Sequence, residues 1–130
     1  MLVVDASVLA PALADDASAD DTARARLRGH TLIAPEVIDL EVVSVLRRRL
    51  LAGNLDARRA ELALADLLDL PVRRISHLRL LDRCWELRHN LTVYVAACVA
   101  LAEAMKAVLV KGDARLSTAP GIRCEAEFLS

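Results

Sequence analysis

Aromatic side chains are nearly absent from this chain of 130 residues, which has one tryptophan, one tyrosine and one phenylalanine (Trp85, Tyr94 and Phe128). Since aromatic rings are the platforms on which many proteins stack single-stranded bases, the sequence excludes a broad stacking surface for nucleic acid. Apolar residues nevertheless make up 55% of the chain. The core must therefore consist mainly of Leu, Val and Ala side chains.

An excess of charge of one sign is also missing. The chain has 17 Lys and Arg residues and 18 Asp and Glu residues, which gives a formal net charge of -1. Bulk charge therefore does not indicate a nucleic-acid-binding protein. Lys106 and Lys111 are the only lysines, so arginine carries nearly all of the positive charge. The charged residues, 27% of the total, are spread along the chain, which argues against intrinsic disorder.

Paired cysteines and long apolar runs are lacking as well. The cysteines number 3 and have no paired spacing, which predicts reduced, buried thiols rather than a disulfide framework. No apolar run approaches the ~20 residues of a membrane helix. Asp5 interrupts the first apolar run, so we expect no signal peptide. These absences predict a soluble, cytoplasmic protein with no membrane contact, folded as a single domain over residues 1–130.

What the chain does contain is a regular alternation of short apolar runs and helical patterns. Strands are predicted at residues 2–4, 31–34, 72–75 and 108–110, with a last extended piece at 122–128. Helices are predicted from residue 8 onward and at 20–28, 35–51, 57–70, 76–89 and 93–105. The predicted N-caps are Ser7, Asp56, Ser76 and Thr92, and Pro35 suits a first helical turn. Apolar strands that alternate with helices predict an α/β fold with a parallel sheet covered on both faces.

Acidic residues follow two of the predicted strands. Asp5 comes directly after the first strand, and Asp113 follows the strand 108–110 by two residues. Both should reach the sheet edge where ligands bind in such folds. Glu41 lies within an apolar helix stripe, where a carboxylate needs a cation or an arginine partner. Taken singly, each acid is more simply explained as a loop residue or a helix cap.

Converging carboxylates would repel one another unless a cation lies between them. A hard divalent ion such as Mg²⁺ or Mn²⁺ relieves that repulsion. Such an ion activates water and binds phosphate oxygens, so the chemistry predicted for this sheet edge is phosphodiester cleavage.

Four segments carry these acids in a fixed order. The first is an apolar strand followed by Asp5 and Ser7, and the others are residues 35–42 with Glu41, 87–97, and 108–116 with Asp113. In order, spacing and overall length they resemble the motifs of PIN domains, most closely those of the toxin ribonucleases of VapBC toxin–antitoxin pairs. The resemblance covers nearly the whole chain.

This resemblance implies a three-layer α/β/α sandwich with a mostly parallel sheet. It further implies an Mg²⁺- or Mn²⁺-dependent endoribonuclease that forms a homodimer and is neutralised by a cognate VapB-type antitoxin. Asp5, Glu41 and Asp113 would be the catalytic metal ligands. Ser7 would orient Asp5, a role no better supported than that of a plain helix cap. Arg115 is a candidate for binding a substrate phosphate.

Three residues depart from the pattern of the family. Val95 stands where the third motif usually has a metal-binding Asp, Cys98 where it has a second Tyr, and Lys111 where the fourth motif usually has Thr. We therefore expect weak or absent metal binding, with Lys111 donating to Asp5 or Asp113, and impaired activity. The alternative is an inactive PIN fold that binds an antitoxin, a second copy or RNA. A phospho-receiver domain is disfavoured, because it needs an adjacent acid pair after the first strand.

Two further features bear on the site and on assembly. Glu103 is expected to be an exposed acid; the functional alternative is a carboxylate at the rim of the site or a partial substitute for the missing Asp. Tyr94 is expected to pack rather than to stack on bases. The helices at 35–51 and 57–70 carry more aliphatic residues than one face needs, which predicts a two-fold homodimer. These residues are Leu40, Val43, Leu50, Leu51, Leu62, Leu64, Leu67 and Leu68.

Overall fold

The computed structural model describes residues 1–15, 18–112 and 120–129. Within them, a 5-stranded sheet has the strand order β3-β2-β1-β4-β5, and every strand pair is parallel. The strands are β1 (Leu2–Val4), β2 (Leu32–Pro35), β3 (Val72–Ile75), β4 (Val108–Lys111) and β5 (Ala126–Phe128). The predicted parallel sheet is therefore confirmed.

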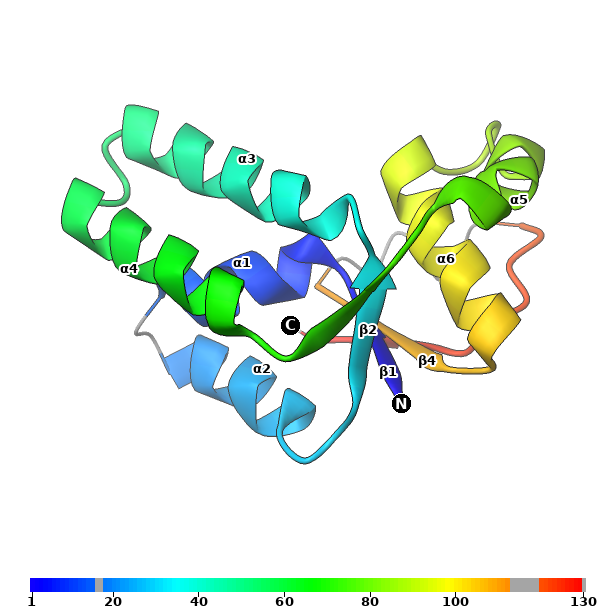
Figure 1. The fold of residues 1–130 in the computed structure, drawn as a ribbon, viewed down its shortest axis with the longest axis horizontal. Coiled ribbons are helices and arrows are strands. Elements are labelled where there is room, and N and C mark those ends of the chain that lie inside the picture. Colours follow the sequence, from blue (N-terminus) through cyan, green and yellow to red (C-terminus); the bar gives the residue numbers. More distant parts are fainter. Residues whose placement is uncertain (16–17, 113–119, 130) are drawn as a thin grey trace.

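The helices cover both faces of this sheet (Figure 1). On one face lie α1 (Ala6–Ala14), α2 (Ser18–Leu27), α3 (Ile38–Leu51) and α4 (Ala57–Asp69). On the other lie a 3₁₀ turn, η1 (Leu78–Leu80), and helices α5 (Leu81–Glu86) and α6 (Val93–Met105). This is the three-layer α/β/α arrangement that the sequence predicts. No helix in the described part of the chain is long and apolar enough to cross a membrane.

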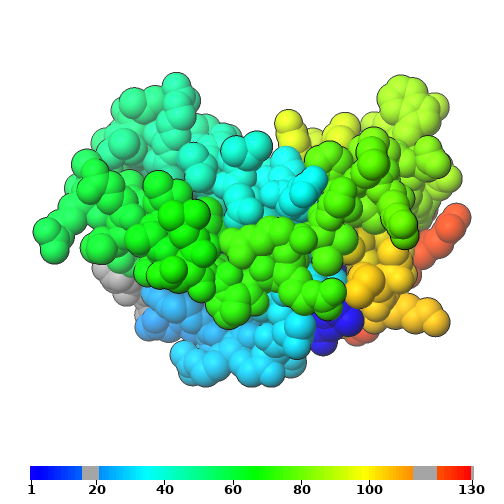
Figure 2. Space-filling model, in the orientation of Figure 1, coloured from blue at the N-terminus to red at the C-terminus, as the bar shows by residue number. Residues whose placement is uncertain are grey.

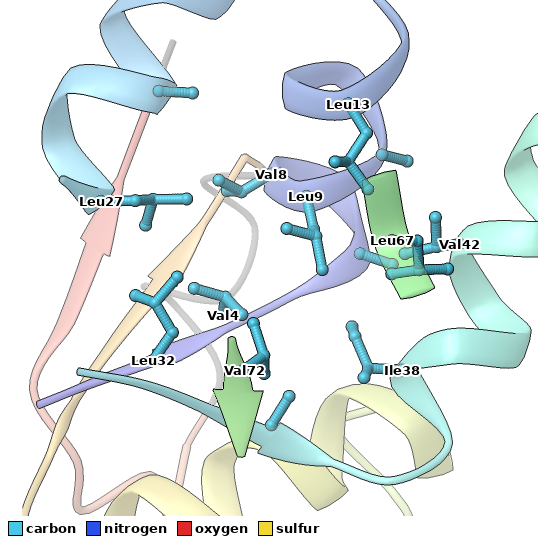
Figure 3. Close-up of a cluster of buried hydrophobic side chains, with 14 of the residues drawn as sticks. Val4, Val8, Leu9, Leu13, Leu27, Leu32, Ile38, Val42, Leu67 and Val72 are labelled. Carbon is cyan, nitrogen blue, oxygen red and sulfur yellow. The ribbon is translucent and has the colours of Figure 1, made fainter. Parts of the chain in front are cut away.

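Each sheet face has its own hydrophobic core, because side chains alternate along a strand. Val3, Ile33 and Leu109 point toward α5 and α6, and all three are fully buried. Their neighbours along the strands point toward α1–α4, and Figure 3 shows this second cluster. Full burial of a side chain such as Leu or Val is worth about 1.5–3 kcal/mol. The continuous apolar runs of β1 and β4 are thus explained by burial on both faces.

Three predicted local features are wrong. Ser7 is not the cap of α1, since Asp5 caps the helix by accepting a hydrogen bond from the Ser7 N–H at 3.0 Å. Pro35 ends strand β2 instead of opening a helix, a position that suits a residue without an N–H donor. Ser76 accepts a bond from the Leu78 N–H, but only the turn η1 and the short α5 follow it.

The other two predicted caps are present. The Asp56 carboxylate accepts from the Arg59 N–H at 2.7 Å, and the Thr92 hydroxyl accepts from the Val95 N–H at 3.3 Å. Thr92 therefore sets the start of α6. Of the aliphatic residues predicted to be in surplus on α3 and α4, Leu67 is buried at 2% exposure and belongs to the core.

The C-terminal end of α1 is held by arginines from three other helices. Arg24 donates to the carbonyls of Ala12 and Asp15, and Arg59 donates to those of Leu13 and Ala14. Arg49 forms an ion pair with the Asp15 carboxylate. These bonds satisfy the free carbonyls at the helix end. They fix α1, whose first turn carries residues of the candidate site.

Candidate active site

The candidate site lies at the carboxyl ends of the two central strands. Asp5 directly follows β1, and Lys111 ends the neighbouring strand β4, which pairs with β1 through Val4 and Val110. Both side chains are buried, although both carry charge. Because parallel strands end at one edge, residues 106 positions apart in the sequence come into contact.

The Asp5 carboxylate is surrounded by donors from the protein itself. Its Oδ2 accepts hydrogen bonds from the Ser7 N–H at 3.0 Å, the Ser7 hydroxyl at 2.5 Å and the Lys111 ammonium at 3.3 Å. Its Oδ1 accepts a weak bond from the Cys98 thiol at 3.7 Å. The prediction that Lys111 donates to Asp5 or Asp113 is confirmed for Asp5. A buried carboxylate with a paired ammonium is far less costly than an isolated one.

Ser7 links the two strand ends. Its hydroxyl donates to Asp5 and accepts from the Gly112 N–H at 2.9 Å. A Cβ at residue 112 would lie 3.0 Å from the Ser7 carbonyl oxygen, so glycine permits this close approach. The expected contact between Ser7 and Asp5 is therefore present. Asp113 and Arg115, predicted as a metal ligand and a phosphate contact, lie outside the described residues.

Glu41 reaches the same region from the first turns of α3. Its Oε1 is buried and accepts no hydrogen bond from the described residues. Burial, followed by repulsion from Asp5, raises the pKa of Glu41 to about 7, and the Lys111 ammonium partly opposes this rise. Burial likewise raises the pKa of the Cys98 thiol well above its ordinary value, and Asp5 adds to the effect. The site therefore holds one carboxylate that is well bonded and one that is not.

The oxygen atoms of these side chains are ligands of the type that a hard cation prefers, but the positive charge of Lys111 opposes a cation at this position. Carboxylate and hydroxyl oxygens are the ligands that Mg²⁺ and Mn²⁺ prefer, and Glu41 Oε1 lacks a partner. Against this, the Lys111 ammonium already contacts Asp5. Among the described residues, no group of 3 or more His, Cys, Asp or Glu side chains is arranged to hold a metal. The donor set therefore fits a divalent ion that must compete with an internal ammonium.

A cleft opens above these residues, between α3 and the start of α6. Its lining includes Asp5, Glu41, Val95 and Lys111, so position 95 lies on the same cavity as both acids. Figure 2 shows the hollow between the two raised parts of the surface formed by α3 and by α5 with α6. Val95 is half-buried and packs against the core beneath α6. A longer polar side chain at position 95 would have access to the cleft.

Two expectations about nearby residues are wrong. Tyr94 is 54% exposed and lines the cleft instead of packing in the core. Glu103 is neither an exposed acid nor a substitute ligand, since its carboxylate binds Arg83 on α5. Helical spacing places Glu103 near the face of Val95, but the eight-residue separation carries it about 12 Å along the axis.

Arg48 is a residue of the cleft that was not predicted from the sequence. It lines the cavity together with Glu41, although three consecutive arginines at residues 47–49 by themselves indicate only a solvated charged face. The available signal was its position seven residues after Glu41, which is two helical turns and hence the same face of α3.

Comparison with known proteins agrees with this geometry. The profile of the PIN domain family matches residues 2–122. Ribonuclease VapC1 of Mycobacterium tuberculosis is 39% identical over 128 residues, covering 98% of this chain and 96% of that protein. The crystal structure of Mycobacterium tuberculosis VapC20, described as a sarcin-ricin loop cleaving toxin, has a TM-score of 0.71 at 20% identity and covers 95% of this chain and 97% of its own.

A second solved structure is VapBC2 from Rickettsia felis, bound to a DNA fragment from its promoter. It has a TM-score of 0.70 at 12% identity and covers 99% of this chain and 98% of the matched chain. At identities of 12% and 20%, the two solved structures show only that the fold is shared. The family profile and the mycobacterial relative show to which family the chain belongs. The chain belongs to the PIN domain family and is a homologue of the mycobacterial VapC ribonucleases.

Proposed function

We propose that this chain, as one PIN domain over residues 1–130, is the endoribonuclease toxin of a type II toxin–antitoxin system. The observation that carries the proposal is the pair of acids in the cleft, Asp5 at the end of β1 and Glu41 on α3 with an unpartnered oxygen. The relationship to a protein named as a VapC ribonuclease points to the same activity. A cytoplasmic location fits an enzyme that acts on RNA.

Asp5, Glu41 and Asp113 are the residues that would hold Mg²⁺ or Mn²⁺. When bound, such an ion supplies an activated water and charge stabilisation at a phosphate. Ser7 keeps the Asp5 carboxylate in place through two hydrogen bonds, from its N–H and its hydroxyl. Glu41, with its raised pKa, is suited to take up a proton near neutral pH in the absence of metal.

We expect metal binding to be weak in this chain. Lys111 places a positive charge against Asp5, and Val95 offers no oxygen where the family pattern has Asp. At an effective dielectric constant near 20, each such change in charge is worth about a kcal/mol or more. The contact between Lys111 and Asp5 also supports a second candidate function, in which the fold binds an antitoxin, a second copy of the chain or RNA without cutting the RNA.

Cleavage of RNA with and without metal separates the two candidates. Purified chain is incubated with structured and single-stranded RNA in millimolar Mn²⁺ or in EDTA, beside Asp5→Asn as the control for a contaminating nuclease. The proposed activity predicts cleavage that needs Mn²⁺ and is absent in Asp5→Asn. Equal products in EDTA, or from the Asp5→Asn protein, would refute it. Uncleaved RNA together with no heat of Mn²⁺ binding would favour the binding module.

Two partners follow from the same proposal. The VapBC2 structure from Rickettsia felis has the same fold, and this supports a VapB-type antitoxin as the neutralising partner. A two-fold homodimer is supported by aliphatic side chains that remain exposed on α3 and α4: Leu40, Val43, Leu50, Leu51, Leu62, Leu64 and Leu68. Light scattering at micromolar concentration tests the dimer, since a lone 14.1 kDa species would contradict it.

A further inference from the structure

One face of α3 runs along the cleft. Val37, which directly precedes the helix, and the helix residues Glu41, Ser44 and Arg48 are spaced by four, three and four positions, and all of them line one cavity. At 1.5 Å per residue, Arg48 lies about 10.5 Å along the helix from Glu41. A stacked nucleic-acid strand rises about 3.4 Å per nucleotide, so this separation corresponds to roughly three nucleotides.

The Arg48 guanidinium is free of protein partners within the described residues. Several other arginines are held by carboxylates or carbonyls, as Arg49 is by Asp15 and Arg74 is by Asp39, and of the exposed arginines without such a bond Arg48 is one that lines the cleft. Arg48 is exposed, borders both parts of the cleft and makes no side-chain bond to any described residue. An unpaired guanidinium at the mouth of a cleft is suited to a phosphate, which it can bind through two parallel hydrogen bonds.

Tyr94 lies on the opposite wall, in the first turn of α6. It borders the same two cavities as Arg48, and its ring is 54% exposed. Trp85 is also exposed, but its ring packs on Arg88 and it does not line the cleft. Phe128 is half-buried against the core. Tyr94 is therefore the aromatic ring that a ligand in the cleft would meet.

We propose that Arg48 and Tyr94 form a two-point clamp for single-stranded RNA, with the guanidinium on a phosphate and the ring stacked on a neighbouring base. The proposal rests on the proposed ribonuclease function and names how that site holds its substrate strand. A polymer with repeated anionic groups and flat faces matches both walls of the cleft. The clamp does not read base identity, because every base offers a face for stacking.

The test measures RNA binding in EDTA, so that binding is separated from cleavage. The probe is a fluorescent oligoadenylate of about ten nucleotides, within the site sizes common for single-strand binding. Its anisotropy is titrated with the full chain from low to high salt. Variants are Arg48→Ala with Arg47→Ala as the control, and Tyr94→Ala and Tyr94→Phe with Trp85→Ala as the control. Arg47 is exposed on the same helix and lines the groove toward α4 instead of the cleft.

The expected result differs between each variant and its control. Arg48→Ala should lower the slope of log affinity against log salt by about 0.7, the loss of one phosphate contact on a single strand. Tyr94→Ala should weaken binding by about 5- to 150-fold, and Tyr94→Phe should keep the affinity of the parent. Arg47→Ala and Trp85→Ala should bind like the parent. Melting temperatures verify that every variant is folded.

Several outcomes would overturn the clamp. Equal effects of Arg47→Ala and Arg48→Ala would show diffuse attraction, and undiminished binding by Tyr94→Ala would remove the stacking contact. Variants that bind RNA normally but lose a VapB-type antitoxin would assign the cleft to a peptide. A parent that binds through both residues yet cleaves nothing in Mn²⁺ would refute the nuclease and leave the clamp intact. Undiminished RNA cleavage by both Arg48→Ala and Tyr94→Ala would support the nuclease and refute the clamp.

Discussion

Two half-buried glutamates, Glu41 and Glu103, have very different hydrogen-bonding environments. Glu103 on α6 accepts bonds from Arg83 at 2.8 and 3.1 Å and from the Arg123 N–H at 2.7 Å. Burial would raise its pKa, but these donors outweigh burial and hold the pKa of Glu103 below its ordinary value. Glu41 on α3 accepts no hydrogen bond at its Oε1 from the described residues, and its pKa is raised to about 7.

The two sites differ in the hydrogen-bond donors that surround each carboxylate. Arg83 also bonds Glu86 and the Gly121 carbonyl, so the Glu103 site joins α5, α6 and the segment before β5 into one network. The Glu41 site instead opens into a cleft, beside a second acid that already has its donors. An acid with satisfied bonds supports the fold, whereas an unsatisfied one near a second acid marks a place for chemistry.

The largest effect should come from removing the centre of the satisfied network. Arg83→Leu leaves Glu103 with one donor and frees the Gly121 carbonyl. We expect a loss of about 2–3 kcal/mol in the free energy of unfolding, since a half-buried carboxylate that loses its charged partner is costly. Chemical denaturation measures this, with Arg79→Leu as the matched control because Arg79 is exposed. A change in Arg83→Leu no larger than in Arg79→Leu would contradict the network.

The opposite sign is expected for Glu41→Gln in EDTA. Because the folded-state pKa of Glu41 is raised, ionisation costs stability, and that cost grows as pH rises from 4.5 toward 7. The variant should therefore be more stable than the parent above pH 7, by about 1–3 kcal/mol, with no difference near pH 4. Urea denaturation at both pH values measures the change. Glu61→Gln, at an exposed acid of α4, is the matched control, and equal changes in the two variants would contradict the prediction.

Introducing an acid at position 95 should allow the region around Glu41 to bind Mg²⁺ more tightly. Val95→Asp adds a carboxylate to the cleft, where it is unfavourable without a cation. We expect Mg²⁺ to stabilise the variant far more than the parent, by about 1.4 kcal/mol at ten times the dissociation constant of the variant. RNA cleavage should increase as well. Melting and cleavage are measured with Mg²⁺ and with EDTA, and no change in either would show that position 95 is not at the metal site.

Lys111→Thr should have a smaller effect by itself, because it removes a competing cation without adding a ligand. It leaves Asp5 bonded to Ser7 and Cys98. The double variant Val95→Asp, Lys111→Thr should exceed either single variant, and the effects need not add, since both alter one charge cluster. A full cycle of the four proteins in Mg²⁺ titrations measures the coupling. A double variant no better than Val95→Asp would show that Lys111 does not compete.

The smallest effect should be the acid dependence of the satisfied network. Since the folded-state pKa of Glu103 is lowered, its contribution is complete above pH 4.5 and is lost as pH falls through the folded-state value. Glu103→Gln should cost below about 1 kcal/mol at pH 7, and the difference from the parent should shrink below pH 4. Melting curves across that range measure it. A constant difference at every pH would show that ionisation of Glu103 does not contribute.

The sequence by itself determined the layers and the family. Runs such as Leu2–Val4 and Val108–Val110 are apolar on both faces, and only strands buried on both sides require this. The caps Asp56 and Thr92 were predictable because a capping bond is local. The predicted cap of α1, Ser7, lies two residues after the actual cap, because Asp5 accepts the capping bond. The predicted start of α3 at Pro35 lies three residues too early, because pairing with Ile75 extends β2 through Pro35.

The tertiary structure decides which charged side chains come into contact. Asp5 and Lys111 are 106 residues apart, and Arg83 and Glu103 are 20 apart; both pairs depend on how the strands and helices are placed in space. The sequence could name Lys111 as a partner for Asp5, but it could not show that Glu103 pairs with Arg83 or that Tyr94 is exposed. Burial and hydrogen bonding follow from packing between distant segments, and these decide whether a carboxylate supports the fold or remains available for chemistry.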